Sequence, residues 1–164
     1  MRIAVVIDAG EQGPAADLVD ALGTHAEVRA LTFDPASETE LGRTAAAIST
    51  LEAELAEARP TAVVAFGDGV AALAAALVAV KLGLHTARVG AGVRSGDRHE
   101  AAEINRIVAD HLCDLLLCAG AGELDNLARE GLADKAEVVP DAQAGGPATA
   151  DAIAAWADSY TSTA

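Results

Sequence analysis

The sequence predicts an α/β fold, and three observations support that prediction. Short apolar and β-branched runs alternate with helical patterns along the chain, as in parallel sheets whose strands are joined by helices. The 164 residues fit one domain with a substantial core. The run TAVVAF at 61–66 has the least polarity, so it belongs near the centre of the sheet with both faces covered. We therefore expect a single Rossmann-like, doubly wound parallel sheet of about six strands in a three-layer α/β/α sandwich.

The first β-α unit occupies the amino terminus. Residues 2–7 form a short β-branched run, which predicts a strand. The pattern at 14–23 places Leu18 and Leu22 on one face of a helix. A second strand is expected at 27–31.

A long helix is expected to follow this strand and to end near residue 58. Ser37 and Glu40 have the spacing of a capping box, in which a serine hydroxyl and a glutamate carboxylate satisfy the first free N–H groups. Leu51 and Leu55 mark the buried stripe of this helix.

The helix expected at 70–82 is apolar on every side. Such a helix needs burial on more than one face, against the sheet and against a second surface, which could belong to another copy of the chain. The remaining elements follow the same rhythm. We expect strands at 85–89, 114–118 and 137–139, and helices at 100–111, at 123–130 with Gly131 after it, and at 148–160.

The crossing from residue 84 to residue 106 holds most of the polar chemistry. Its loop contains Gly90, Gly92 and Gly96, which allow sharp turns or a close approach to a ligand. In an open parallel sheet, ligands bind outside the carboxyl ends of the strands. We therefore predict a substrate-binding set on this loop and the helix after it, consisting of Arg94, Ser95, Asp97, Glu103, Asn105 and Arg106.

Asp68 is the predicted catalytic residue, and it stands between two glycines after the central strand. Its carboxylate either caps the next helix or acts as an acid or base facing the polar loop. Arg94 either grips a phosphate or carboxylate or bonds Asp97 and holds the loop. Glu103 and Arg106 either contact the ligand or form an intrahelical pair. We expect Asp68 and the loop at 94–97 to face each other.

Composition argues against several classes. The formal net charge is −14, with 9 Arg and 2 Lys, whereas nucleic-acid binding depends on Lys and Arg neutralising phosphates. We therefore expect no nucleic-acid partner. No apolar run reaches the roughly 20 residues of a membrane helix, so no membrane association is expected either.

Cofactors and metals are also not expected. The glycine-rich turns lack the G-x-G-x-x-G spacing of dinucleotide sites, and no Walker-type lysine loop occurs. Cys113 and Cys118 are not accompanied by the second cysteine pair that a zinc site would need. The four histidines are not spaced as metal ligands. Met1 is followed directly by the first strand without a secretory leader, which predicts a cytoplasmic protein with reduced thiols.

Four motifs in order resemble the amino-terminal half of the non-hydrolysing UDP-N-acetylglucosamine 2-epimerases, a two-domain, glycosyltransferase-B-like family. RPTAVVAFGDG is similar to the family's KPD-V-V-V-HGDT, GAGVRSGD to EAGLRTGD, EINR to EEANR, and LDNLAREG to NLLxEG. The resemblance implies one half of the two-domain architecture, an isomerase reaction and a sugar-nucleotide ligand. It also implies dimerisation through this domain.

The departures from the family concern catalysis. In the family, catalysis is attributed to the Asp of HGD, the Glu of EAG, the first Glu of EEANR and a His of the second domain. Of these only the Asp is retained, as Asp68, while Gly90 and Ala102 stand at the two glutamate positions. The stretch DAGEQGPA replaces the family's GTRPEAIK loop, and the sequence contains no second, uridine-diphosphate-binding domain.

These features predict residues 1–146 as the Rossmann-like domain and 147–164 as a terminal helix that packs back, with a tail. They predict a nucleotide-sugar-binding subunit that needs a partner chain with the second domain for catalysis. The alternative is a non-catalytic pseudo-epimerase that assembles as a homodimer with a structural or regulatory role.

Overall fold

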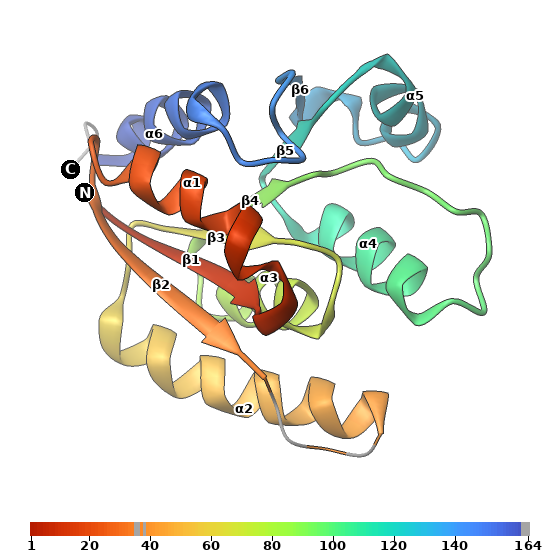
Figure 1. Cartoon of the computed structure of the whole chain (residues 1–164), viewed down its shortest axis with the longest axis horizontal. Helices are drawn as coiled ribbons and strands as arrows, with labels where there is room; N and C mark the ends of the chain where they lie inside the picture. Colours follow the sequence, from red (N-terminus) through yellow and green to blue (C-terminus); the bar gives the residue numbers. More distant parts are fainter. Residues whose placement is uncertain (35–36, 38, 162–164) are drawn as a thin grey trace.

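The predicted parallel sheet is present in the computed structural model, which describes residues 1–34, 37 and 39–161. Six parallel strands lie in the order β2-β1-β3-β4-β5-β6 (Figure 1). Their bounds are β1 Arg2–Asp8, β2 Glu27–Phe33, β3 Ala62–Phe66, β4 His85–Val89, β5 Leu115–Cys118 and β6 Ala136–Val138. The apolar run that became β3 lies third in this order with all five residues buried, which confirms the prediction of a central strand.

Helices join the strands and cover both faces of the sheet. Their bounds are α1 Gln12–Leu22, α2 Glu40–Ala58, α3 Val70–Lys81, α4 Ala101–Leu112, α5 Ala121–Arg129 and α6 Pro147–Thr161, with short 3₁₀ turns at Ala9–Glu11 and Ala133–Lys135. None of the described helices is long and apolar enough to cross a membrane.

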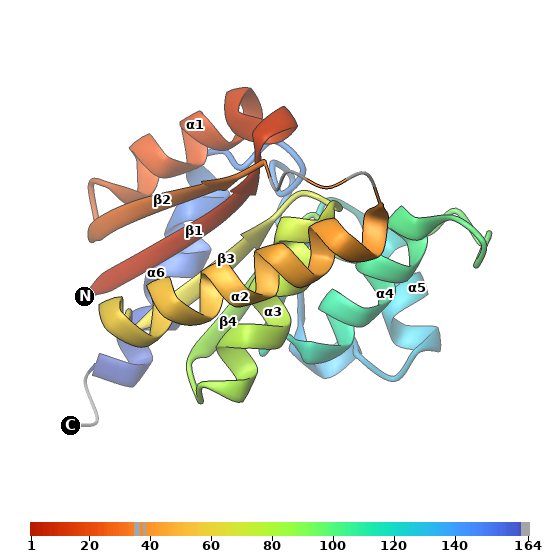
Figure 2. The ribbon, with the colours of Figure 1, turned by 90° about the horizontal axis from the view of Figure 1, so that it is seen from below.

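Alternation along the strands divides the core into two layers. In β1, Ile3, Val5 and Ile7 pack with α1 and α6 on one face, and Ala4 and Val6 pack with α2 and α3 on the other. A third cluster joins β5 to α4 and α5. The result is the expected α/β/α sandwich (Figure 2), and it brings the carboxyl ends of all strands to one edge.

Helix α3 finds its second surface within the chain itself. Eight of its residues are buried, because it packs against the sheet, α2 and α4. The all-apolar composition is therefore explained without a second copy of the chain. A stripe of Leu73, Leu77 and Val80 remains partly or fully exposed along α3.

Two local expectations need correction or qualification. Thr39, not Ser37, is the N-cap of α2, and its hydroxyl accepts the Gly42 N–H at 3.0 Å. Ser37 Oγ instead accepts the Thr39 N–H at 3.3 Å, and Gly42 at the third helical position has no side chain that could complete a capping box. The terminal helix packs against α1 in the core cluster, while the tail at 162–164 lies outside the described residues.

Candidate functional site

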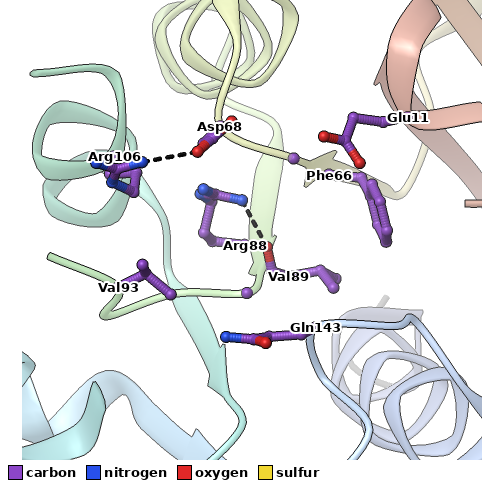
Figure 3. A pocket seen from close by; sticks show the side chains of 10 residues that line it. Glu11, Phe66, Asp68, Arg88, Val89, Val93, Arg106 and Gln143 are labelled. Carbon is purple, nitrogen blue, oxygen red and sulfur yellow. Dashed lines mark hydrogen bonds and ion pairs between the residues drawn. The ribbon is translucent and has the colours of Figure 1, made fainter. Parts of the chain in front are cut away.

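A cavity of about 280 Å³ opens at the carboxyl ends of β3 and β4, where sequence analysis placed the site. Residues from five separate segments meet there (Figure 3). The lining consists of Glu11, Phe66, Gly67, Asp68, Arg88, Val89, Gly90, Val93, Arg106 and Gln143.

Helix α4 holds Asp68 at the cavity. Arg106 Nη1 donates to Asp68 Oδ2 at 2.7 Å, and Asn105 Nδ2 donates to the Asp68 carbonyl at 3.3 Å. The Asp68 side chain remains 48% exposed, so its second oxygen can reach a ligand. Of the two roles considered for Asp68, capping of the next helix is wrong, because the cap residue of α3 is Gly69 without a side-chain hydrogen bond.

Asp8, at the end of β1, interacts with the start of α3 instead. Its Oδ1 accepts the Ala71 N–H at 3.2 Å, which satisfies a free donor in the first turn. Burial raises the pKa of Asp8, and the charges of Glu11 and Asp68 add to this, against the lowering effect of the helix N–H groups. A Cβ at Gly69 would lie 2.5 Å from Asp8 Oδ2, so glycine makes this close contact possible.

Glu103 ties the glycine-rich loop to α4. Its carboxylate accepts the N–H groups of Ser95 and Gly96 at 3.0 Å each and pairs with Arg106, also at 3.0 Å. Burial alone raises the pKa of Glu103, but these hydrogen bonds and the Arg106 charge lower it to about 2. The Glu103–Arg106 intrahelical pair is therefore present, and it positions both the loop and the guanidinium that holds Asp68.

The structure does not bring Arg94 to Asp68. The guanidinium of Arg94 makes a bidentate pair with Glu130, at 2.8 Å for both contacts, and a further bond of 2.9 Å to Asp110. It is not among the residues lining the cavity, and neither are Ser95 and Asp97. The predicted Arg94–Asp97 alternative also differs from the structure, in which Asp97 Oδ1 accepts the His99 N–H at 2.9 Å. From this loop, Gly90 and Val93 line the cavity.

Sequence reasoning missed three polar residues of the cavity. Arg88 comes from β4, Glu11 from the turn after β1, and Gln143 from the segment between β6 and α6. The signal for Arg88 was a lone arginine in an apolar strand, HTARV, one residue before its carboxyl end. Glu11 and Gln143 lie in segments whose paths only the folded structure shows.

The cavity therefore combines two guanidinium groups, two carboxylates and one amide. Such a set suits a polar ligand that carries hydroxyl and anionic groups. Gly90 and Ala102 stand where the family described in the sequence analysis has glutamates, and they supply no carboxylate. Gly90 adopts φ +74°, a left-handed conformation that favours glycine, and Ala102 lies in the first turn of α4.

A doubly wound parallel sheet with a polar cavity at the carboxyl ends of its central strands is typical of Rossmann-like domains. The family model described as UDP-N-acetylglucosamine 2-epimerase matches residues 20–141. The chain belongs to this family.

Curated relatives match about half of the chain. The UDP-N-acetylglucosamine 2-epimerase of Methanocaldococcus jannaschii is 43% identical over 82 residues, which is 50% of this chain and 22% of that protein. The UDP-2,3-diacetamido-2,3-dideoxy-D-glucuronate 2-epimerase of Pseudomonas aeruginosa is 38% identical over 86 residues, 52% of this chain and 24% of that one.

Solved structures match over a longer range. The M. jannaschii epimerase in complex with UDP-GlcNAc and UDP superposes with a TM-score of 0.80 at 27% identity and covers 85% of this chain. The match covers 46% of that protein, so the chain spans less than half the length of this relative. A galactosyltransferase, WaaB, shares the fold with a TM-score of 0.59 at 17% identity.

Proposed function

We propose that this chain is a nucleotide-sugar-binding unit of the epimerase family, which needs a second domain or a partner chain for catalysis. The observation that carries the proposal is the Asp68–Arg106 pair, at 2.7 Å, on the cavity at the carboxyl ends of β3 and β4. Family membership and a solved relative that holds UDP-GlcNAc and UDP support the choice of ligand.

The residues of the predicted site then fall into three groups with different roles. Asp68 accepts either a hydrogen bond from a ligand hydroxyl or a proton, through the oxygen that is not bonded to Arg106. Glu103 and Asn105 position Arg106 and Asp68 from α4. The residues of the loop, Arg94, Ser95 and Asp97, shape the turn after Gly92 and do not line the cavity.

Dependence on further groups follows from the chemistry of epimerisation. Where no hydride carrier takes part, inverting a carbon that bears hydrogen requires removal and return of a proton, which needs positioned acids and bases. Gly90 and Ala102 provide neither, and loss of one such group commonly costs about 100-fold or more in rate. A second chain or domain is therefore proposed to complete the reaction, and co-purification of such a partner would support this.

Calorimetric titration of UDP-GlcNAc tests the binding proposal. We expect one site in the wild type, at least tenfold weaker binding in Asp68→Asn, and unchanged binding in Asp125→Asn, an exposed aspartate outside the cavity. Absence of binding to the wild type, or equal losses in both variants, would contradict the proposal.

The second candidate is the non-catalytic, self-assembling relative. It is favoured by an apolar surface along the adjacent helices α3 and α4, where Val80 is 40%, Ile104 38% and Val108 37% exposed. Sedimentation velocity at micromolar concentration tests it, since Ile104→Lys should convert a dimer into a monomer. A wild-type monomer at the same concentration would remove this candidate.

A further inference from the structure

Arg88 is a buried arginine whose donors are only partly used. Its side chain is 2% exposed, and both of its hydrogen bonds come from Nη1, to the carbonyls of Val89 at 2.5 Å and Ala65 at 3.4 Å. Within the described part of the chain, Nε has no hydrogen-bond partner and Nη2 donates no hydrogen bond. A guanidinium has five N–H donors, so three of them lack an acceptor.

The nearest carboxylate does not satisfy these donors. Asp110 Oδ1 lies 3.5 Å from Arg88 Nε, close enough for an ion pair but beyond normal hydrogen-bond length, and neither atom has a hydrogen bond in the described part of the chain. The other oxygen of Asp110 is already occupied by the Gly92 N–H at 3.0 Å and by Arg94 at 2.9 Å. A buried cation with unused donors is unfavourable, and its presence calls for an explanation.

The location of Arg88 supplies one. In Figure 3 its guanidinium lies at the cavity between Asp68 and Val89. Asp68 is paired with Arg106, and in the described part of the chain no hydrogen bond joins it to Arg88. An acceptor that enters the cavity would meet Nη2, because Nε is fully buried beside Asp110.

We propose that Arg88 anchors an anionic group of the ligand, a carboxylate or a phosphate, in this cavity. The planar guanidinium matches both groups through paired N–H donors. The proposal rests on the proposed function, in that it takes the cavity as the nucleotide-sugar site. In such a ligand the anion is either the diphosphate or a carboxylate on the sugar ring.

Three probes separate these two sources: UDP, UDP-GlcNAc and UDP-N-acetylglucosaminuronate, each titrated into the wild type, Arg88→Met and the control Arg98→Met. Arg98 is exposed and outside the cavity lining. Arg88→Met should bind at least tenfold more weakly to probes that carry the recognised anion, and Arg98→Met should match the wild type. A loss for all three probes assigns the diphosphate, and a loss for the uronate alone assigns the ring carboxylate. Equal affinities of Arg88→Met and the wild type for all three overturn the proposal.

Arg88 can be tested separately if the nucleotide-sugar proposal is wrong. If the wild type binds none of the probes, inorganic phosphate should still raise its melting temperature, and this rise should be absent in Arg88→Met. An equal rise in both proteins, or none in the wild type, overturns the anchor.

A folding control completes the design. Because Asp110 keeps its pair with Arg94 at 2.9 Å, Arg88→Met leaves that carboxylate with a cationic partner, and we expect the variant to fold, which urea unfolding checks. Should it fail to fold, Arg88→Lys keeps the charge without the paired donors, and it should bind the preferred probe several-fold more weakly. Wild-type affinity in Arg88→Lys would also contradict the proposal.

Discussion

Arg106 Nη1 lies 2.7 Å from Asp68 Oδ2, and this ion pair links α4 to the turn that follows β3. Arg106 also contacts Glu103 at 3.0 Å and Glu100 at 3.3 Å, so one guanidinium forms ion pairs with three carboxylates. Glu103 in turn fixes the loop at Ser95 and Gly96. The position of Asp68 therefore depends on a network that runs from β3 through α4 to the loop after β4.

Replacing Arg106 by Met should destabilise the fold. The buried Glu103 would lose its cationic partner, and breaking such a pair costs about 3–5 kcal/mol. The remaining N–H bonds from the loop should place the loss at the lower end of this range. Urea unfolding measures it, with the exposed Arg98→Met as the matched control, which should change stability by less than about 0.5 kcal/mol.

Replacing Arg94 by Ala should also destabilise the protein, at little cost to ligand contacts. The change removes the cation shared by Asp110, which is fully buried, and Glu130. A loss of about 3–5 kcal/mol is expected in thermal or urea unfolding. A variant of wild-type stability with weakened nucleotide-sugar binding would instead support a direct ligand role for Arg94.

Stability should fall in acid partly through Glu103. Its folded pKa of about 2 lies below its ordinary value of 4.5, so its contribution is complete above pH 4.5 and is lost as the pH falls toward 2. Glu103→Gln should lower stability at pH 7 by about 1.5–3 kcal/mol. The difference between the two proteins should shrink between pH 4.5 and 2, and a constant difference would refute this role.

Two glycines of the same loop offer a matched pair. Gly92 has φ +83°, and a Cβ there would lie 2.5 Å from the Glu123 carbonyl oxygen. Gly96 has a similar φ of +79° with nothing within 4 Å. Both alanine variants incur about 1–2 kcal/mol of left-handed backbone strain, and Gly92→Ala should lose roughly 1–3 kcal/mol more through steric overlap. Equal losses in urea unfolding would contradict the close packing of α5 on this loop.

The fold was predictable because each element carries its own local signal. The continuous burial along β1 and β3 follows directly from their apolar residues, and so does their place in a parallel sheet. The N-cap of α2 was not predictable from the pattern, because Ser37 and Thr39 both precede Glu40 and only the backbone path selects Thr39.

The site was predictable only in part, because its contacts join distant segments. Asp68 and Arg106 were found from motifs, but the side-chain direction of Arg94 depends on Glu130, 36 residues later. Capping of α3 by Asp8 joins residues 63 apart, and it leaves Asp68 available to the cavity. Arg88 was missed because a single arginine in a strand does not reveal that the folded chain buries it at the cavity.

The location of ligand binding is tested most directly by titrating UDP-GlcNAc into the ¹⁵N-labelled chain and mapping the amide shifts. We predict the largest changes at the cavity, in Gly67, Asp68, Gly90 and Val93, with little change in the surface loop at 97–99. Changes confined to that loop or to the surroundings of Arg94 and Glu130, with the cavity amides unmoved, would contradict this prediction.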